Sequence, residues 1–327
     1  MRALIVGLGS IGRRHLSNLR QIEPDASITV WHQHTRADEV PGADRVVYSL
    51  EAALAEQPEI ALLAGPAVTH IDTGLVLARA GVPLFIEKPL SHTGAGVAEL
   101  IDLCHQRNLV LMVGYNLRFS EPLRLMQQAV SQGRIGRLLS LRAEVGQYLP
   151  DWRKDTDYRQ GVSARRDLGG GAILELSHEL DYARWLMGEV AAVSAQADRV
   201  SDLDIDVEDL AEITLRFQSG AIGNVHVDMV QRAVTRTCRI IGTDGTLTWD
   251  AISNQVRLFE AATQAWCELH PAITLDRNAM YVAELRHFLD CVAQRTRPLI
   301  GGEDGWQVLK IALAAKQSAQ EQRVIEL

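Results

Sequence analysis

A glycine-rich turn near the N-terminus is the feature that most constrains the fold of this chain. Residues 7–12 follow an apolar run at 3–6 and precede a segment of helical character at 11–20. In a strand–turn–helix unit, glycines at this spacing allow a tight turn, close approach of a pyrophosphate and close packing of helix on strand. The helix N-terminus adds amide donors and a partial positive charge. We therefore predict dinucleotide contacts at Gly7, Leu8, Gly9, Ser10, Ile11 and Gly12, the alternative being a plain glycine turn in another α/β fold.

The rest of the first 118 residues alternates short apolar runs with helical patterns. Strands are expected at 27–31, 45–48, 59–64, 84–86 and 110–113, and helices at 50–56, 69–80 and 93–107. Strands that alternate with helices of about 10–15 residues are typical of βαβ units. We therefore predict that residues 1–118 form an α/β domain of Rossmann type, with a doubly wound parallel sheet.

The pattern changes after Phe119. Strands are expected at 138–145, 190–197, 211–217, 221–227, 236–242, 246–249 and 255–259, and helices at 122–132, 172–187, 278–293 and 306–319. Short turns at 218–220 and 243–245 separate neighbouring strands, which indicates antiparallel pairing. Residues 119–327 should therefore form an α+β domain with a large open, mainly antiparallel sheet. Because such a sheet needs its second face covered, we expect the protein to self-associate.

Composition narrows the possible partners and compartment. The 327 residues include 33 basic and 41 acidic side chains, a net charge of −8, which disfavours binding to nucleic acid or to an anionic membrane surface. No apolar run approaches the ~20 residues that a membrane span needs, and no signal peptide is recognisable. The four cysteines are widely spaced, without a disulfide or metal-site pattern. We expect a cytoplasmic protein without a metal.

The choice of dinucleotide depends on the residues that follow the second expected strand. An acidic residue about 20 positions beyond the glycine turn usually binds the ribose hydroxyl of NAD. His32 stands there instead, and no carboxylate occurs before Asp38. Arg36 could meet the 2′-phosphate of NADP, or it could be a solvated loop residue. The sequence therefore predicts NAD or NADP, with a slight preference for NADP.

Several motifs together resemble the Gfo/Idh/MocA oxidoreductase family over essentially the whole chain. They are the turn at 7–12, Gly65-Pro66 followed by Thr69-His70, Glu87-Lys88-Pro89, the run at 114–119, and the three glycines at 169–171 followed by His178. The resemblance implies an NAD(P)-dependent enzyme that acts on a sugar, cyclitol or sugar derivative. It also implies cofactor contacts at Gly65, Pro66, His70, Glu87 and Lys88. The resemblance further implies that the open-sheet C-terminal domain forms a homodimer or homotetramer.

Lys88 stands where the chemistry is expected. It follows a strand, and ligands of open α/β sheets bind at the carboxyl ends of strands. A cation there would stabilise the alkoxide that precedes hydride loss. The family resemblance makes this lysine a catalytic-site residue, whereas the alternative is a surface Glu-Lys pair.

A second group of candidates lies on the expected helix at 172–187. On one continuous helix, an apolar stripe leaves Glu175, His178 and Tyr182 near the opposite side. The histidine suits proton transfer near neutral pH, although a histidine on a polar helix face is most often only solvated. In the family, an acid/base histidine on this helix commonly follows an Asp by four residues; here Glu175 precedes His178 by three. We predict that His178 acts with Lys88 and that Glu175 or Tyr182 assists.

A polar stretch at 151–167 supplies candidate substrate contacts. Aromatic and cationic side chains suit stacking on a sugar face and holding an anionic group, while neighbouring aspartates favour a solvated loop instead. Arg118 could equally form a structural ion pair. The candidate substrate contacts are Asn116, Arg118, Trp152, Arg153, Tyr158, Arg165 and His178.

Three functions compete. The leading prediction is a hydride transfer between nicotinamide and a secondary alcohol or ketone of a sugar-like substrate. A reductase of a non-sugar carbonyl or imine is an alternative on the same scaffold. A catalytically silent, cofactor- or sugar-binding regulatory protein is the alternative from another class, and it would need neither Lys88 nor His178.

Overall fold

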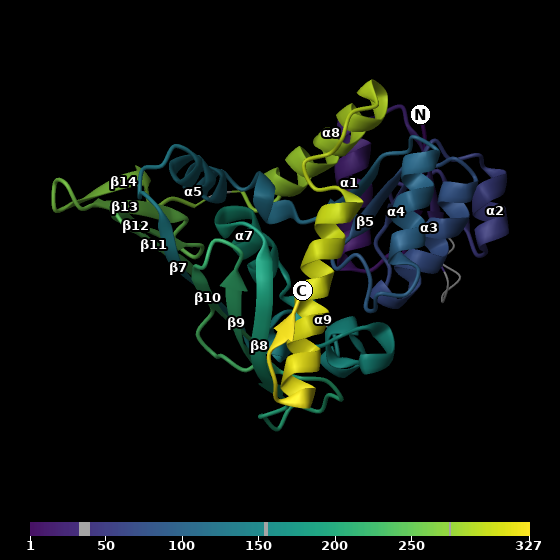
Figure 1. Cartoon of the computed structure of the whole chain (residues 1–327). Coiled ribbons are helices and arrows are strands. Elements are labelled where there is room, and N and C mark those ends of the chain that lie inside the picture. Colours follow the sequence, from purple (N-terminus) through teal and green to yellow (C-terminus); the bar gives the residue numbers. More distant parts are fainter. Residues whose placement is uncertain (33–39, 154–155, 275) are drawn as a thin grey trace. The chain divides into compact units, whose positions relative to one another are not determined.

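The computed structural model describes residues 1–32, 40–153, 156–274 and 276–327 of the chain (Figure 1). The chain divides into two compact units, Met1–Asn116 with Arg277–Leu309 and Leu117–Asp276 with Lys310–Leu327. The boundary between Asn116 and Leu117 lies close to the predicted boundary at residue 118. Arg277–Leu309 belongs to the first unit, which differs from the prediction that residues 119–327 form one domain.

A parallel sheet forms the core of the first unit. Its described strands lie in the order β3-β2-β1-β4-β5-β6 and are β1 (Arg2–Val6), β2 (Ser27–Trp31), β3 (Arg45–Val47), β4 (Ile60–Leu63), β5 (Leu84–Glu87) and β6 (Leu111–Gly114). Most strand residues are buried and apolar, as is typical of a parallel sheet covered on both faces. The strand order reverses direction between β1 and β4, where open α/β sheets bind ligands. The predicted doubly wound sheet is confirmed.

Helices of the first unit come from both ends of the chain. They are α1 (Ser10–Ile22), α2 (Leu50–Ala55), η1 (Ala67–Thr69), α3 (His70–Arg79), α4 (Val97–Gln106) and α8 (Ala279–Gln294). α8 packs against α1 (Figure 1), and the side-chain amides of Asn18 and Asn278 exchange two hydrogen bonds of 3.2 and 2.8 Å. This packing is the physical reason that Arg277–Leu309 belongs to the first unit.

A larger sheet dominates the second unit. Its described strands lie in the order β14-β13-β12-β11-β7-β10-β9-β8-β15 and are β7 (Leu138–Gly146), β8 (Val190–Asp198), β9 (Leu210–Phe217), β10 (Ile222–Asp228), β11 (Thr235–Gly242), β12 (Gly245–Asp250), β13 (Gln255–Glu260), β14 (Ala265–His270) and β15 (Ile325–Glu326). β7 and β10 pair in parallel, and the other neighbours pair antiparallel. The predicted large, mainly antiparallel sheet is therefore confirmed.

One face of this sheet packs against helices. α7 (His178–Met187) contacts β7 and β10, and α5 (Glu121–Ser131) contacts β12 and β13. The strands alternate buried residues with exposed or half-buried ones, as in β9, so the opposite face is largely exposed. The short helices are η2 (Asn116–Phe119), η3 (Leu149–Asp151), η4 (Tyr158–Gln160), η5 (Val162–Ala164), η6 (Arg166–Leu168) and α6 (Ala172–Glu175).

The expected helix at 172–187 is broken. α6 ends at Glu175 and α7 begins at His178, because the backbone of Leu176 leaves the helical region at φ −101° and ψ 28°. Ile173, Leu174 and Leu176 are all buried, so this segment does not present a single apolar stripe.

α9 (Gly302–Glu321) contributes its first part to the first unit and its remainder to the second. Neither it nor any other helix in the described part of the chain combines the length and apolar character that crossing a bilayer requires.

Candidate active site

The glycine turn of the first unit has no room for side chains at two of its positions. Gly7 has φ +91°, and a Cβ there would lie 2.8 Å from the Gly65 nitrogen. A Cβ on Gly12 would lie 2.1 Å from the Gly7 oxygen, whereas Gly9 faces open space. Strand β1, helix α1 and the loop after β4 can therefore approach closely only because these residues are glycines.

The first turn of α1 fits a pyrophosphate. Gly9 is the N-cap residue, no side chain caps the helix, and its first turn contains no acidic residue. The first backbone N–H groups of a helix lack intrahelical partners, and they carry partial positive charge. Gly9 and Ser10 are exposed, so a dinucleotide phosphate could reach these donors.

The residues that would select NAD or NADP are only partly described. Trp31 ends β2 and is buried, and His32 follows it half-buried. Arg36, the residue behind the slight preference for NADP, lies outside the described residues.

His70 joins two loops at the carboxyl end of the sheet. Its side chain is buried, with Nε2 3.0 Å from the Gly65 carbonyl oxygen and Nδ1 3.1 Å from the Pro89 carbonyl oxygen. Burial lowers the pKa of His70. Both ring nitrogens face protein carbonyls, so His70 lies between the loops that follow β4 and β5, and its contact with the cofactor stays a prediction. Gly65 and Pro66 themselves are half-buried at that edge.

Glu87 is also turned into the protein. This last residue of β5 is 7 % exposed, and its Oε1 lies 2.6 Å from Nε2 of His15. Its Oε2 accepts a hydrogen bond of 3.2 Å from the Lys88 backbone N–H. Glu87 therefore has an internal role, and its contact with the cofactor stays a prediction. Lys88 is half-buried, and the Lys88–Pro89 peptide bond is cis.

His15 is a residue that the sequence reasoning missed. It lies on α1 three residues after Gly12, and its side chain is fully buried. The only local signal was its place beside Leu16 and Leu19, which are also buried. Its partner Glu87 is 72 residues away in the chain, so no short motif joins them.

Asn116 and Tyr281 complete this part of the first unit. Tyr281 lies on α8 with the Arg14 guanidinium 4.4 Å from its ring centre. Burial, and next the charge of Glu87, raise the pKa of Tyr281, while the charge of Arg14 and then a hydrogen bond with the Asn116 side chain oppose this rise. Asn116 is itself buried, so Asn116, Tyr281 and Arg14 form one polar cluster within the first unit.

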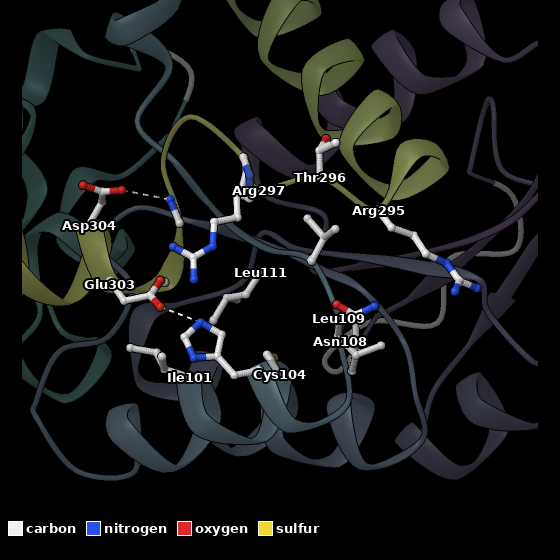
Figure 2. Close-up of a pocket in the computed structure, with 15 residues that line it drawn as sticks. Ile101, Cys104, Asn108, Leu109, Leu111, Arg295, Thr296, Arg297, Glu303 and Asp304 are labelled. Carbon is white, nitrogen blue, oxygen red and sulfur yellow. Dashed lines mark hydrogen bonds and ion pairs between the residues drawn. The ribbon is translucent and has the colours of Figure 1, made fainter.

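A hollow of about 560 Å³ opens elsewhere in the first unit (Figure 2). It lies at the start of β6, around Leu111, and so at the opposite end of the strand from the predicted cofactor contacts. Arg295 and Arg297 line it together with Glu303, which forms a 2.5 Å ion pair with His105. Charges of both signs line this hollow, so it indicates no particular class of ligand.

In the second unit, the glycines before α6 permit close approach of the chain itself. A Cβ on Gly170 would lie 2.1 Å from the Val162 oxygen, and one on Gly171, at φ +108°, would lie 2.4 Å from Oε1 of Glu208. Lys316 lies 3.1 Å from the same carboxylate. The glycines thus let Glu208 and the loop at 162–165 pack against the start of α6.

Glu175 and His178 lie on either side of the break between α6 and α7, and both are half-buried. The Ser163 hydroxyl donates a hydrogen bond of 2.9 Å to Oε2 of Glu175. This carboxylate is therefore fixed by the loop at 162–165, which the sequence pattern did not indicate.

Tyr182 lies in the core instead of on an open helix face. Its side chain is fully buried, and its ring meets Trp249 edge-on at 5.8 Å. Burial, and then the nearby Glu179 carboxylate, raise the pKa of Tyr182 well above its usual value. The predicted position of Tyr182 on the polar face of the helix was wrong, because it assumed one straight helix with a single buried stripe.

Arg118 forms the structural ion pair that was the second interpretation of this residue. It is 3 % exposed, and its guanidinium donates to both carboxylate oxygens of Asp181 at 2.6–3.1 Å. The Arg118 guanidinium carbon also lies 5.4 Å from the ring centre of Trp185. We therefore do not retain Arg118 as a substrate contact.

Several polar side chains of the loop at 151–167 bind to other residues of the protein. Trp152 donates its indole N–H to the Gln147 oxygen at 2.9 Å, and the Tyr158 hydroxyl accepts the Asp204 N–H at 3.2 Å. Arg165 pairs with Asp167 at 2.5 Å. The exposed Arg153 adjoins residues outside the described ranges.

The fold and the glycine turn define a dinucleotide-binding protein of Rossmann type. Residues 1–115 match the family model described as "Oxidoreductase family, NAD-binding Rossmann fold", and residues 123–248 match the GFO/IDH/MocA C-terminal domain. The chain belongs to the Gfo/Idh/MocA family, so the resemblance and the predicted enzyme class are confirmed.

Named relatives span most of the chain. Myo-inositol 2-dehydrogenase of Thermotoga maritima is 30 % identical over 346 residues, covering 100 % of this chain and 98 % of the relative. The 1,5-anhydro-D-fructose reductase of Ensifer adhaerens is 27 % identical and covers 79 % and 76 %. Levoglucosan dehydrogenase in complex with NADH has the same fold, with a TM-score of 0.89, 22 % identity and coverage of 100 % and 98 %.

Proposed function

We propose that this protein transfers a hydride between a nicotinamide cofactor and a ring carbon bearing a secondary hydroxyl of a sugar or cyclitol. The observation that carries this proposal is the 30 % identity, over the full chain, to a dehydrogenase of a cyclitol. The anhydrofructose reductase and the levoglucosan dehydrogenase support the same substrate class.

Three side chains carry the proposed chemistry. A bound nicotinamide supplies the hydride acceptor or donor. The Lys88 ammonium polarises the substrate oxygen and stabilises it as negative charge develops. His178 takes the hydroxyl proton during oxidation and returns it during reduction. Glu175, held by the Ser163 hydroxyl, assists His178.

The substrate class is a neutral polyol. Of the arginines in the loop at 151–167, Arg159 pairs with Asp157 and Arg165 pairs with Asp167, which makes these two less available to an anionic group. Asn116, Trp152, Arg153 and Tyr158 remain candidate contacts. Hydroxyl groups can be bound by neutral donors and acceptors and by stacking on an aromatic face.

NAD(H) is the proposed cofactor. The matched family model is described as NAD-binding, and the levoglucosan dehydrogenase structure holds NADH. The slight preference for NADP found no support in these comparisons and rests on Arg36.

A homo-oligomer built on the open sheet face is part of the proposal. Ile222 on β10 and Ile241 on β11 both pair with Ser140 on β7, so the two isoleucines flank one position. They are 53 % and 38 % exposed. Burial of these two isoleucines against a second copy of the chain would remove apolar surface from water. The four cysteines are free thiols, which fits the proposed cytoplasmic location.

A turnover assay tests the proposal. The chain is mixed with NAD and, in turn, with myo-inositol and levoglucosan, and with NADH and 1,5-anhydrofructose, while nicotinamide absorbance is followed. We expect turnover of at least one of these compounds, abolished in Lys88→Ala. Tight NADH binding without turnover of any member of a broad polyol panel would favour the regulatory protein instead.

A further inference from the structure

Two buried histidines flank the turn that carries Lys88. His15 approaches it from α1 and contacts the residue before the lysine, with 2.6 Å between Nε2 and Oε1 of Glu87. His70 approaches it from α3 and contacts the residue after the lysine, with 3.1 Å between Nδ1 and the Pro89 oxygen. Both rings are at most 1 % exposed.

The His15 contact fixes a carboxylate that in turn holds the Lys88 backbone. A carboxylate only accepts hydrogen bonds, so Nε2 of His15 donates to it. The other oxygen of Glu87 accepts the Lys88 N–H at 3.2 Å. Nδ1 of His15 is buried without a hydrogen-bond partner among the residues the structure describes, so the ring's polar anchorage is the contact with Glu87.

Packing leaves Glu87 little freedom to turn away. The His15 ring meets Phe85 edge-on at 5.1 Å, and Phe85 meets Phe288 at 5.7 Å. A Cβ on Gly114 would lie 3.2 Å from the Glu87 carboxyl carbon, so the glycine on the neighbouring strand β6 provides the space that this carboxylate occupies. Strand β6 thus lies close to the carboxylate, while Phe85 packs against the His15 ring that contacts it.

The His70 contact ties the same turn to the loop after β4. Its Nε2 lies 3.0 Å from the Gly65 oxygen, and a Cβ on Gly7 would lie 2.8 Å from the Gly65 nitrogen. The imidazole therefore lies between the loop that packs against the dinucleotide turn and the Pro89 carbonyl. In its neutral form, which burial favours, it donates a hydrogen bond to one of these two carbonyls and packs against the other.

We propose that His15 and His70 are positioning residues for Lys88, one fixing the carboxylate before it and the other the carbonyl after it. The inference rests on the proposed function only in taking Lys88 as a catalytic residue. A misplacement of about 1 Å of a catalytic group costs roughly 10²-fold in rate, so loss of either contact should reduce turnover more than it weakens cofactor binding.

The chain offers a direct probe of Lys88. It contains only four lysines, Lys88, Lys154, Lys310 and Lys316. Reductive methylation with ¹³C-formaldehyde labels each amine and retains its charge, so NMR should show few lysine signals, and the Lys88→Arg variant identifies the one from Lys88. This measurement needs no substrate.

The variants are His15→Leu and His15→Gln, with His70→Leu and His70→Gln as the second pair. Leucine removes the hydrogen bond, whereas glutamine keeps an N–H donor. We expect the leucine variants to move or broaden the Lys88 signal and to lower kcat roughly 10–100-fold, with the NADH dissociation constant changed less than about threefold. The glutamine variants should recover part of both effects.

His105→Gln is the matched control, because it removes a histidine of the same unit whose ion pair with Glu303 is half exposed. It should leave the Lys88 signal and kcat unchanged. If the leucine variants do not fold, Glu87→Gln tests the same contact from the other side and should shift the Lys88 signal. A Lys88 signal and a kcat that match wild type in folded His15 and His70 variants would overturn the proposal. A shifted signal together with full turnover in Lys88→Ala would instead uphold the positioning role and reject Lys88 as the catalytic residue.

Discussion

The guanidinium of Arg118 and the carboxylate of Asp181 form a buried ion pair with a closest separation of 2.6 Å. Removal of one partner from such a pair leaves an uncompensated buried charge, which costs about 3–5 kcal/mol. We expect Asp181→Ala to lower the free energy of unfolding by about this amount in urea titrations. Asp204→Ala is the control, since that carboxylate is exposed and pairs with Arg159 at 3.7 Å, where a loss of about 0–1 kcal/mol is expected. Equal losses in the two variants would contradict the structural role.

His178 should be required for turnover but not for cofactor binding. It begins α7, in the second unit, whereas the dinucleotide turn belongs to the first. His178→Asn should reduce kcat roughly 10²–10⁴-fold, the usual effect of losing a positioned proton-transfer group, with the NADH dissociation constant nearly unchanged. Turnover close to wild type would move the proton-transfer role to another group, Lys88 first.

The dissociation constants of NADH and NADPH, measured by fluorescence titration, decide the cofactor proposal. We expect NADH to bind at least tenfold more tightly, a difference of about 1.4 kcal/mol. Arg36→Ala should leave this ratio unchanged. If NADPH binds more tightly and Arg36→Ala removes the preference, the sequence-based interpretation of Arg36 would be restored.

Charge placed on the open sheet face should prevent self-association. The double variant Ile222→Glu, Ile241→Glu puts two carboxylates on strands that flank β7, and burial of such charges against a second copy is unfavourable. Sedimentation should show an oligomer for wild type and a monomer for the variant. A wild-type monomer at micromolar concentration would contradict the proposed assembly.

The stability contributed by His226 should depend on pH. Hydrogen bonds to Asp228, and then to Glu212, raise the pKa of His226 from 6.5 to about 9. Because the folded state favours the protonated ring, this stabilisation is complete below pH 6.5 and is lost as the pH rises to about 9. The difference in free energy of unfolding between wild type and His226→Gln should therefore shrink over this interval. A difference that stays constant with pH would rule out the linkage.

Local sequence patterns were sufficient to predict the first sheet and the turns at its carboxyl edge. Strand–turn–helix patterns describe contacts between neighbouring segments, and such contacts require the glycines at 7 and 12 and place Lys88 after β5. Such patterns could not predict the contact of His15 with Glu87, because this contact depends on how α1 packs on β5.

In the second unit, local sequence patterns were not sufficient to predict the structure around the candidate catalytic residues. The helical wheel treated residues 172–187 as one straight element with one buried side, and it therefore placed Tyr182 on the polar face. The break at Leu176 and burial on more than one side depend on Glu208 and Trp249, which come from distant parts of the chain. The triple glycine was informative about close approach, but only the fold could identify the approaching group as Glu208.

The late return of α8 to the first unit has a consequence for biosynthesis. A ribosome releases the dinucleotide turn first, yet Asn278, which pairs with Asn18 on α1, is made only after β7–β14 have been synthesised. The N-terminal unit therefore cannot be completed until nearly the whole polypeptide has emerged. An expressed fragment that ends at residue 118 would leave the α8-binding side of α1 uncovered, so fragments for study need Arg277–Leu309 joined back to residues 1–116.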